Sequence, residues 1–176
     1  MSSSPSALRV DIVALRRQSG VVDTVRTTVG MDDLEITTSR VRDGRVDVDL
    51  SVESVVEGIV VRGRIVAITD GGCRRCLEPV AGQIDLSIRE IFELHPTEGE
   101  TWPVADDHID LEPMVREAVL LALPFTPLCA DDCRGPQPDR FPTLVAGDGS
   151  AQAESPADPR WAALDELELD ELELDE

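Results

Sequence analysis

Two close cysteine pairs are the residues in this sequence best suited to chemistry. Cys73 and Cys76 form a C-x2-C pair, and Cys129 and Cys133 form a C-x3-C pair that begins after 52 intervening residues. Four thiolates supplied by two tight turns are a ligand set for a structural, tetrahedral zinc site. The glycines at 71–72 allow the backbone to turn so that its amide groups can face the sulfur atoms. The spacing predicts a zinc site that fastens the second pair to the first, with four reduced thiols in loops as the alternative.

A redox or other catalytic role has less support in the sequence. A thioredoxin-like C-x-x-C opens a helix after a strand, which lowers the pKa of its first thiol. Here Leu77-Glu78-Pro79 and the alternating pattern of a strand follow the pair. His95 and His108 stand alone, and the sequence has no glycine-rich phosphate loop and no nucleophile with a base at recognisable spacing. These features predict a protein that is not an enzyme.

The charged residues define a second candidate site. All 16 basic residues are arginine, against 36 acidic ones, which gives a net charge of −20. Residues 1–90 contribute −2 and residues 91–176 contribute −18. This balance is unfavourable for unaided nucleic-acid binding and suits a basic partner. Arginines of the less acidic half could still form a basic face, unless they are simply the solvent-side residues of strands. They are Arg40, Arg42, Arg45, Arg62, Arg64, Arg74 and Arg75, and the last four are the candidate nucleic-acid-binding residues.

The elements that must position these residues are mostly strands. Period-two alternation runs through residues 45–52 and 84–91, and strand composition is found at 8–12, 21–29 and 59–68, with a turn at 16–20. Apolar residues recur at helical spacing from Leu111 to Ala122, with Asp110 as the expected N-cap and Pro124 closing the helix. The pattern predicts an α+β domain at residues 8–135, in which an antiparallel, meander-like β-sheet is packed by one main α-helix.

The two ends of the chain have the composition of disordered segments. We expect a disordered N-terminus at residues 1–7, and a Pro/Gly-rich linker followed by a disordered acidic C-terminal tail at residues 136–176. The pentamer Leu-Asp-Glu-Leu-Glu repeats in this tail, which is either a solubilising segment or an acidic-hydrophobic segment that meets a basic surface. In the second case the expected partner-binding residues are Trp161, Leu164, Leu167 and Leu169.

The chain has no sequence signal for membrane insertion or export. No apolar run approaches the roughly 18–20 residues that a membrane span requires. The N-terminus lacks a basic region followed by an apolar one. We therefore expect a cytoplasmic protein without membrane partners, in a reducing compartment where cysteines bind metal or stay reduced.

Three stretches of the sequence resemble a known family. They are Cys73 to Pro79, Asp110 to Cys129 and Asp158 to Leu164. Together, over about residues 8–164, they resemble the bacterial YceD family, also called the large ribosomal RNA subunit accumulation protein family, and look like its actinobacterial branch. The resemblance implies a non-enzymatic role in 23S rRNA accumulation and large ribosomal subunit assembly.

The chain departs from the pattern of that branch after its second cysteine pair. Gln137 and Arg140 stand where two further cysteines would be expected. A family metal site that used those later cysteines is lost here, whereas one that used the four retained cysteines survives.

Three modes of action remain open at the level of the sequence. The acidic surface and tail could hold a basic large-subunit ribosomal protein, or the arginine-bearing sheet face could bind the 23S rRNA precursor. The chain could also be a zinc-binding structural or interaction protein. The charge balance favours the first of these.

Overall fold

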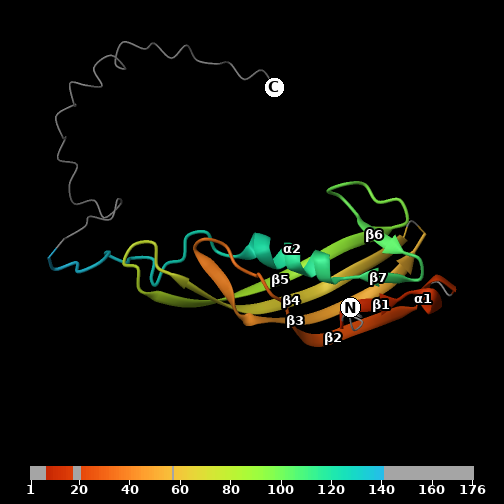
Figure 1. Cartoon of the computed structure of the whole chain (residues 1–176), viewed down its shortest axis with the longest axis horizontal. Helices are drawn as coiled ribbons and strands as arrows, with labels where there is room; N and C mark the ends of the chain where they lie inside the picture. The colour runs from red at the N-terminus through yellow and green to blue at the C-terminus, as the bar shows by residue number, and fades with distance from the viewer. Residues whose placement is uncertain (1–6, 18–20, 57, 141–176) are drawn as a thin grey trace, which may run out of the picture. The chain divides into compact units, whose positions relative to one another are not determined.

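Strands dominate the structure. The computed structural model describes residues 7–17, 21–56 and 58–140, which are 52% strand and 12% helix. The elements in chain order are β1 (Arg9–Asp11), α1 (Val13–Arg17), β2 (Val22–Gly30), β3 (Ser39–Val55), β4 (Gly58–Gly72), β5 (Pro79–Glu93), β6 (Trp102–Ala105), β7 (His108–Asp110) and α2 (Glu112–Ala122) (Figure 1).

The seven strands form one curled, mixed sheet in the order β1-β7-β6-β5-β4-β3-β2. Strands β2 to β5 are successive antiparallel neighbours, but β6 pairs with β5 in parallel, with Phe92 opposite Trp102. The expected α+β fold, an antiparallel meander packed by one helix, is therefore wrong. The chain is mostly β, its sheet is mixed, and its described residues form two helices. The sequence could not show this, because β6 and β7 have only four and three residues, too few for a period-two pattern.

The core lies on one face of the long strands. In β3 the side chains of Val46, Val48, Leu50 and Val52 are buried, while the intervening residues are more exposed. This alternation is what the period-two pattern predicts for a strand with one face against the core. Helix α2 lies along the sheet and contacts β4 and β5 (Figure 1). Its buried residues, which join the same core cluster, are Met114, Val115 and Val119.

Most elements expected from the sequence are present, with longer bounds. The strands expected at 45–52, 59–68 and 84–91 lie inside β3, β4 and β5. The N-cap of α2 is Leu111, so the prediction of Asp110 as the N-cap is wrong by one position. The Asp110 carboxylate nevertheless accepts a hydrogen bond of 2.9 Å from the Glu112 backbone N–H. The turn expected at residues 16–20 overlaps the end of α1, and residues 18–20 lie outside the described part of the chain.

Several predictions on the two ends of the chain fall outside the described residues. They concern residues 1–6 and residues 141–176, and the second range includes Trp161 and the leucines of the acidic repeat. The domain bounds therefore stay a prediction. Neither described helix combines the length and the apolar character needed to span a lipid bilayer.

Candidate functional site

The four cysteines converge beside the turn between β4 and β5. Their sulfur atoms all lie within 4.8 Å of one another. The Sγ atoms of Cys73 and Cys133 are 3.8 Å apart, and those of Cys76 and Cys129 are 3.7 Å apart. A tetrahedral ion with metal–sulfur bonds of about 2.3 Å requires sulfur separations of about 3.8 Å. The cluster therefore has the dimensions of a site that could hold a metal ion.

The first pair is presented by a tight turn. The Cys73 backbone N–H donates to the Glu78 carbonyl at 2.8 Å, and the Leu77 N–H donates to the Cys73 carbonyl at 2.8 Å. Leu77 closes the turn in a left-handed conformation, with a φ of 65°. Such a conformation is costly for a leucine and persists where the surrounding contacts demand it. The turn leaves Cys73 fully buried and Cys76 half-buried.

The glycines before this turn do not form it, although the sequence predicts that they allow the backbone to turn. Gly71 and Gly72 are the last residues of β4, not part of the turn itself. A Cβ atom on Gly71 would lie 2.8 Å from the Thr38 carbonyl oxygen and 3.1 Å from Pro127. The missing side chain therefore allows the segment after α2 to approach the strand closely.

The segment after α2 carries the second pair back to the sheet. The Ser39 hydroxyl donates to the Pro124 carbonyl at 3.0 Å, and the Arg74 backbone N–H donates to the Pro127 carbonyl at 2.9 Å. A further turn, in which the Cys133 N–H donates to the Ala130 carbonyl at 3.1 Å, connects the two cysteines of the second pair. These contacts position Cys129 and Cys133 beside the first pair independently of any bound ion.

Backbone amide groups make the Cys73 thiol more acidic than an ordinary cysteine. The backbone N–H groups of Cys76 and Cys129 lower its pKa to about 5. In contrast, the pKa of Cys129 is raised to about 12, first by the side chain of Cys133 and then by those of Cys76 and Cys73. A negative charge is thus favoured on the sulfur of Cys73 and disfavoured on the sulfur of Cys129. A cation bound by all four sulfurs would stabilise the negative charge on each of them.

Arg75, expected from the sequence to contact nucleic acid, is hydrogen-bonded to the loop that carries the second cysteine pair. Its Nη1 donates to the carbonyls of Asp131 and Cys133, at 2.9 Å each. The neighbouring Arg74 has an exposed side chain. Sequence reasoning missed the structural contacts of Arg75, because its partners lie 56 and 58 residues away.

We expect Arg75→Ala to loosen this loop and Arg74→Ala to leave it intact. The first substitution removes two hydrogen bonds from a charged donor, which should lower the free energy of unfolding by about 1–3 kcal/mol. Urea unfolding and hydrogen exchange at residues 129–135 would measure both variants. Equal losses in the two variants would contradict the structural role of Arg75.

The other two arginines lie on the solvent face of β4, where carboxylates accompany them. Arg62 pairs with Glu53, and Arg64 pairs with Asp85. The same face carries a pair between Arg26 and Asp49, with Nε and Oδ1 2.9 Å apart. The structure thus places Arg62 and Arg64 together, and Arg74 and Arg75 separately in the turn beyond Gly72. Whether these four residues bind nucleic acid stays a prediction.

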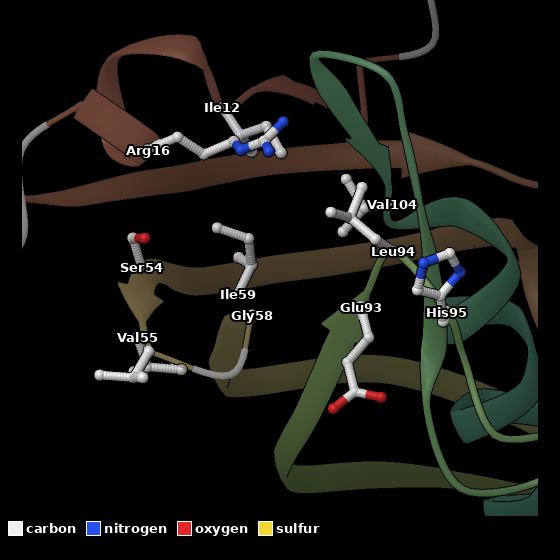
Figure 2. Close-up of a pocket in the computed structure, with 11 residues that line it drawn as sticks. Ile12, Arg16, Ser54, Val55, Gly58, Ile59, Glu93, Leu94, His95 and Val104 are labelled. Carbon is white, nitrogen blue, oxygen red and sulfur yellow. The ribbon is translucent and has the colours of Figure 1, made fainter.

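A pocket of about 420 Å³ opens near the end of β3 and the start of β4. Figure 2 shows Ile12 and Arg16 on one side of it and Val104, Leu94 and His95 on the other. Arg16 donates to the Asp106 carbonyl at 3.3 Å, and Glu93 accepts from the Thr101 hydroxyl at 3.1 Å. Arg16 and Glu93 are therefore not arranged as an acid–base pair in this pocket.

The fold and the site define a mostly β protein with a four-cysteine cluster that could hold a metal ion. The chain belongs to the YceD family, described as large ribosomal RNA subunit accumulation protein YceD, whose family profile matches residues 61–168. The matched region contains all four cysteines. This match confirms the family expected from the sequence. The expectation of an actinobacterial-type member is confirmed by the mycobacterial relatives that follow.

Relatives of the chain are known from several bacteria. It is 37% identical over 175 residues to the uncharacterized proteins Rv2926c of Mycobacterium tuberculosis and Mb2951c of Mycobacterium bovis, covering 92% of this chain and 82% of theirs. It is 29% identical over 102 residues to the uncharacterized protein YlbN of Bacillus subtilis, covering 54% of this chain and 58% of that protein. No solved structure matches.

Proposed function

We propose that this protein is a non-enzymatic, cytoplasmic factor in 23S rRNA accumulation and large-subunit assembly, and that it acts by binding a basic ribosomal protein. The family description supports the role in large ribosomal RNA subunit accumulation. The observation that carries the finer proposal is charge: residues 91–176 have a net charge of −18, whereas Arg62 and Arg64 of the sheet face are matched by carboxylates. Such a protein attracts a basic partner and repels free phosphate backbones.

We also propose that the metal of the four-cysteine cluster is zinc and that its role is structural. Zinc accepts four thiolates in tetrahedral geometry and needs no open coordination position for this purpose. The separations between the sulfur atoms suit this arrangement, and the cysteines missing at Gln137 and Arg140 are not needed for it. Bound zinc would fix the segment after α2 against the turn between β4 and β5.

Binding to ribosomal proteins in the presence and absence of rRNA tests the proposed partner. The full chain is immobilised and exposed to a large-subunit extract that contains both protein and rRNA, with and without nuclease. We expect basic ribosomal proteins to be retained after nuclease treatment and to be released as salt is raised, because screening weakens contacts between exposed charges. Loss of all retention after nuclease treatment would contradict the proposal and favour direct binding to rRNA.

Two variants separate the alternatives in the same assay. Deletion of residues 164–176, which removes the acidic repeat, should weaken retention of a basic protein at low salt. Replacement of Arg62 and Arg64 by glutamine should leave that retention unchanged within about twofold, since these residues face carboxylates. The opposite pattern would indicate that the arginine-bearing face makes the contact.

A further inference from the structure

Helix α2 exposes one large apolar side chain, Leu121, that the core does not use. The buried stripe of the helix is formed by Met114, Val115 and Val119. Leu121 lies outside this stripe and is 75% exposed. Two pockets of about 310 and 410 Å³ adjoin Leu121, and Trp102 and Glu117 also line both of them. We call these two adjoining pockets the α2 groove.

Trp102 gives the groove a fixed aromatic wall. The residue is half-buried at the start of β6, and its indole N–H donates to Oε2 of Glu90 at 3.2 Å. Its ring centroid lies 6.3 Å from that of the buried Phe92. A tryptophan held in place by a hydrogen bond and a ring contact loses little conformational entropy when a ligand packs on it. Such residues often dominate the affinity of an interface.

The charge that the groove offers to a ligand is negative. Glu90, Glu100 and Glu117 line its pockets, and none of them belongs to the ion pairs found among the described residues. The cation of the lining, Arg116, is already engaged, because it donates to the Asp32 carbonyl at 2.5 Å and pairs with Glu112 at 3.4 Å. The groove thus combines an apolar centre with uncompensated carboxylates.

We propose that the α2 groove binds a short basic segment of a protein partner, with an aliphatic side chain of that segment packed between Trp102 and Leu121. Arginine or lysine residues on either side of this anchor would meet Glu90, Glu100 and Glu117. The groove deepens the proposed function, on which it rests, by placing the contact with a basic ribosomal protein. Charge disfavours an RNA ligand, and the acidic repeat at residues 164–176 of this chain would be repelled for the same reason.

Trp102 itself can report occupancy of the groove. The chain has two tryptophans, so the full chain carrying Trp161→Phe retains Trp102 as its single tryptophan. The probe is a short, tryptophan-free peptide in which arginine and lysine flank a pair of leucines. The control peptide has glutamate in place of each cation. We expect the basic peptide to change the Trp102 fluorescence saturably and the acidic peptide to leave it unchanged.

Two matched double variants test where the peptide binds. Leu121→Ser with Glu117→Gln should weaken peptide binding about tenfold or more, as expected for removal of an interface anchor together with a charge partner. Leu94→Ser with Glu35→Gln removes an exposed leucine and an exposed glutamate elsewhere and should change the affinity less than about twofold. Circular dichroism shows that each variant is folded before its affinity is compared.

The outcomes distinguish the groove from the wider function. An unchanged Trp102 signal, or equal affinity of both double variants for the basic peptide, would overturn the groove proposal. If ribosomal proteins are nevertheless retained by the wild-type chain, the proposed function stands and another surface makes the contact. If the peptide occupies the groove but no ribosomal protein is retained, the groove is supported and the ribosomal partner is wrong.

Discussion

Replacing Cys73 by serine is expected to abolish stoichiometric zinc binding and to loosen the segment after α2, which backbone contacts still hold beside the sheet. Cys73 is the fully buried member of the cluster, and the backbone amides of Cys76 and Cys129 face its sulfur. A serine hydroxyl at this position would be a poor zinc ligand. Because apparent binding free energies at structural zinc sites are about 10–16 kcal/mol, the loss of one ligand should lower the affinity by orders of magnitude.

The sheet itself should survive this substitution. The core cluster of buried residues runs from Leu8 to Leu123 and contains none of the four cysteines. Zinc loss should therefore increase hydrogen exchange in residues 124–135 while the far-ultraviolet circular dichroism of the strands is retained. In the metal-free protein the effect of Cys129→Ser on stability should be smaller than that of Cys73→Ser, because Cys129 is exposed and Cys73 is buried.

Elemental analysis of protein purified without a metal-affinity tag measures the zinc directly. We expect about one zinc per wild-type chain, as in a four-thiolate structural site, and thiols that react only after a chelator is added. A wild-type chain without metal, with four freely reacting thiols, would contradict the zinc proposal. The cysteine pairs would then act as a reduced cluster held by the backbone contacts of Ser39, Arg74 and Arg75.

Gly63→Ala is expected to have the second large effect, this time on the sheet. Gly63 lies in the middle of β4, opposite Leu50 of β3 and Ile88 of β5, with a φ of 153°. A Cβ atom there would lie 2.1 Å from the Asp49 carbonyl oxygen and 2.9 Å from the Leu50 Cα. Both obstacles are backbone atoms, so β3 would have to move away from β4.

The expected cost of this change is about 3 kcal/mol or more, from backbone strain and overpacking together. Gly30→Ala is the matched control, because a Cβ atom at Gly30 would meet no atom within 4 Å and the residue has no positive φ. Its effect should stay within about 0.5 kcal/mol. Urea unfolding of both variants would measure the difference, and similar midpoints would show that the β3–β4 contact adapts without cost.

Local patterns in the sequence were sufficient for individual elements. The alternation of Val46, Val48, Leu50 and Val52 predicted a strand because each of these side chains meets the same core. Apolar residues at helical spacing from Leu111 to Ala122 predicted α2, because side chains three or four residues apart on a helix also meet the core. The spacing within each cysteine pair likewise pointed to a metal site, since two ligands from one turn depend only on nearby residues.

Contacts between distant segments were decided by the tertiary structure. The parallel pairing of β6 with β5 and the return of β7 to β1 depend on loops and very short strands that have no periodic signature. The same holds for the contacts of Arg75 with residues 131 and 133 and for the juxtaposition of Trp102 with Leu121.

The sequence by itself therefore determined the family, the individual long strands, the main helix and the four cysteines that could hold a metal ion. Only the tertiary structure decided the mixed, curled sheet, the meeting of the two cysteine pairs and the acidic groove beside α2. The physical reason is that periodicity and turn chemistry act over a few residues. Strand order and side-chain convergence depend instead on how the whole chain buries its apolar surface.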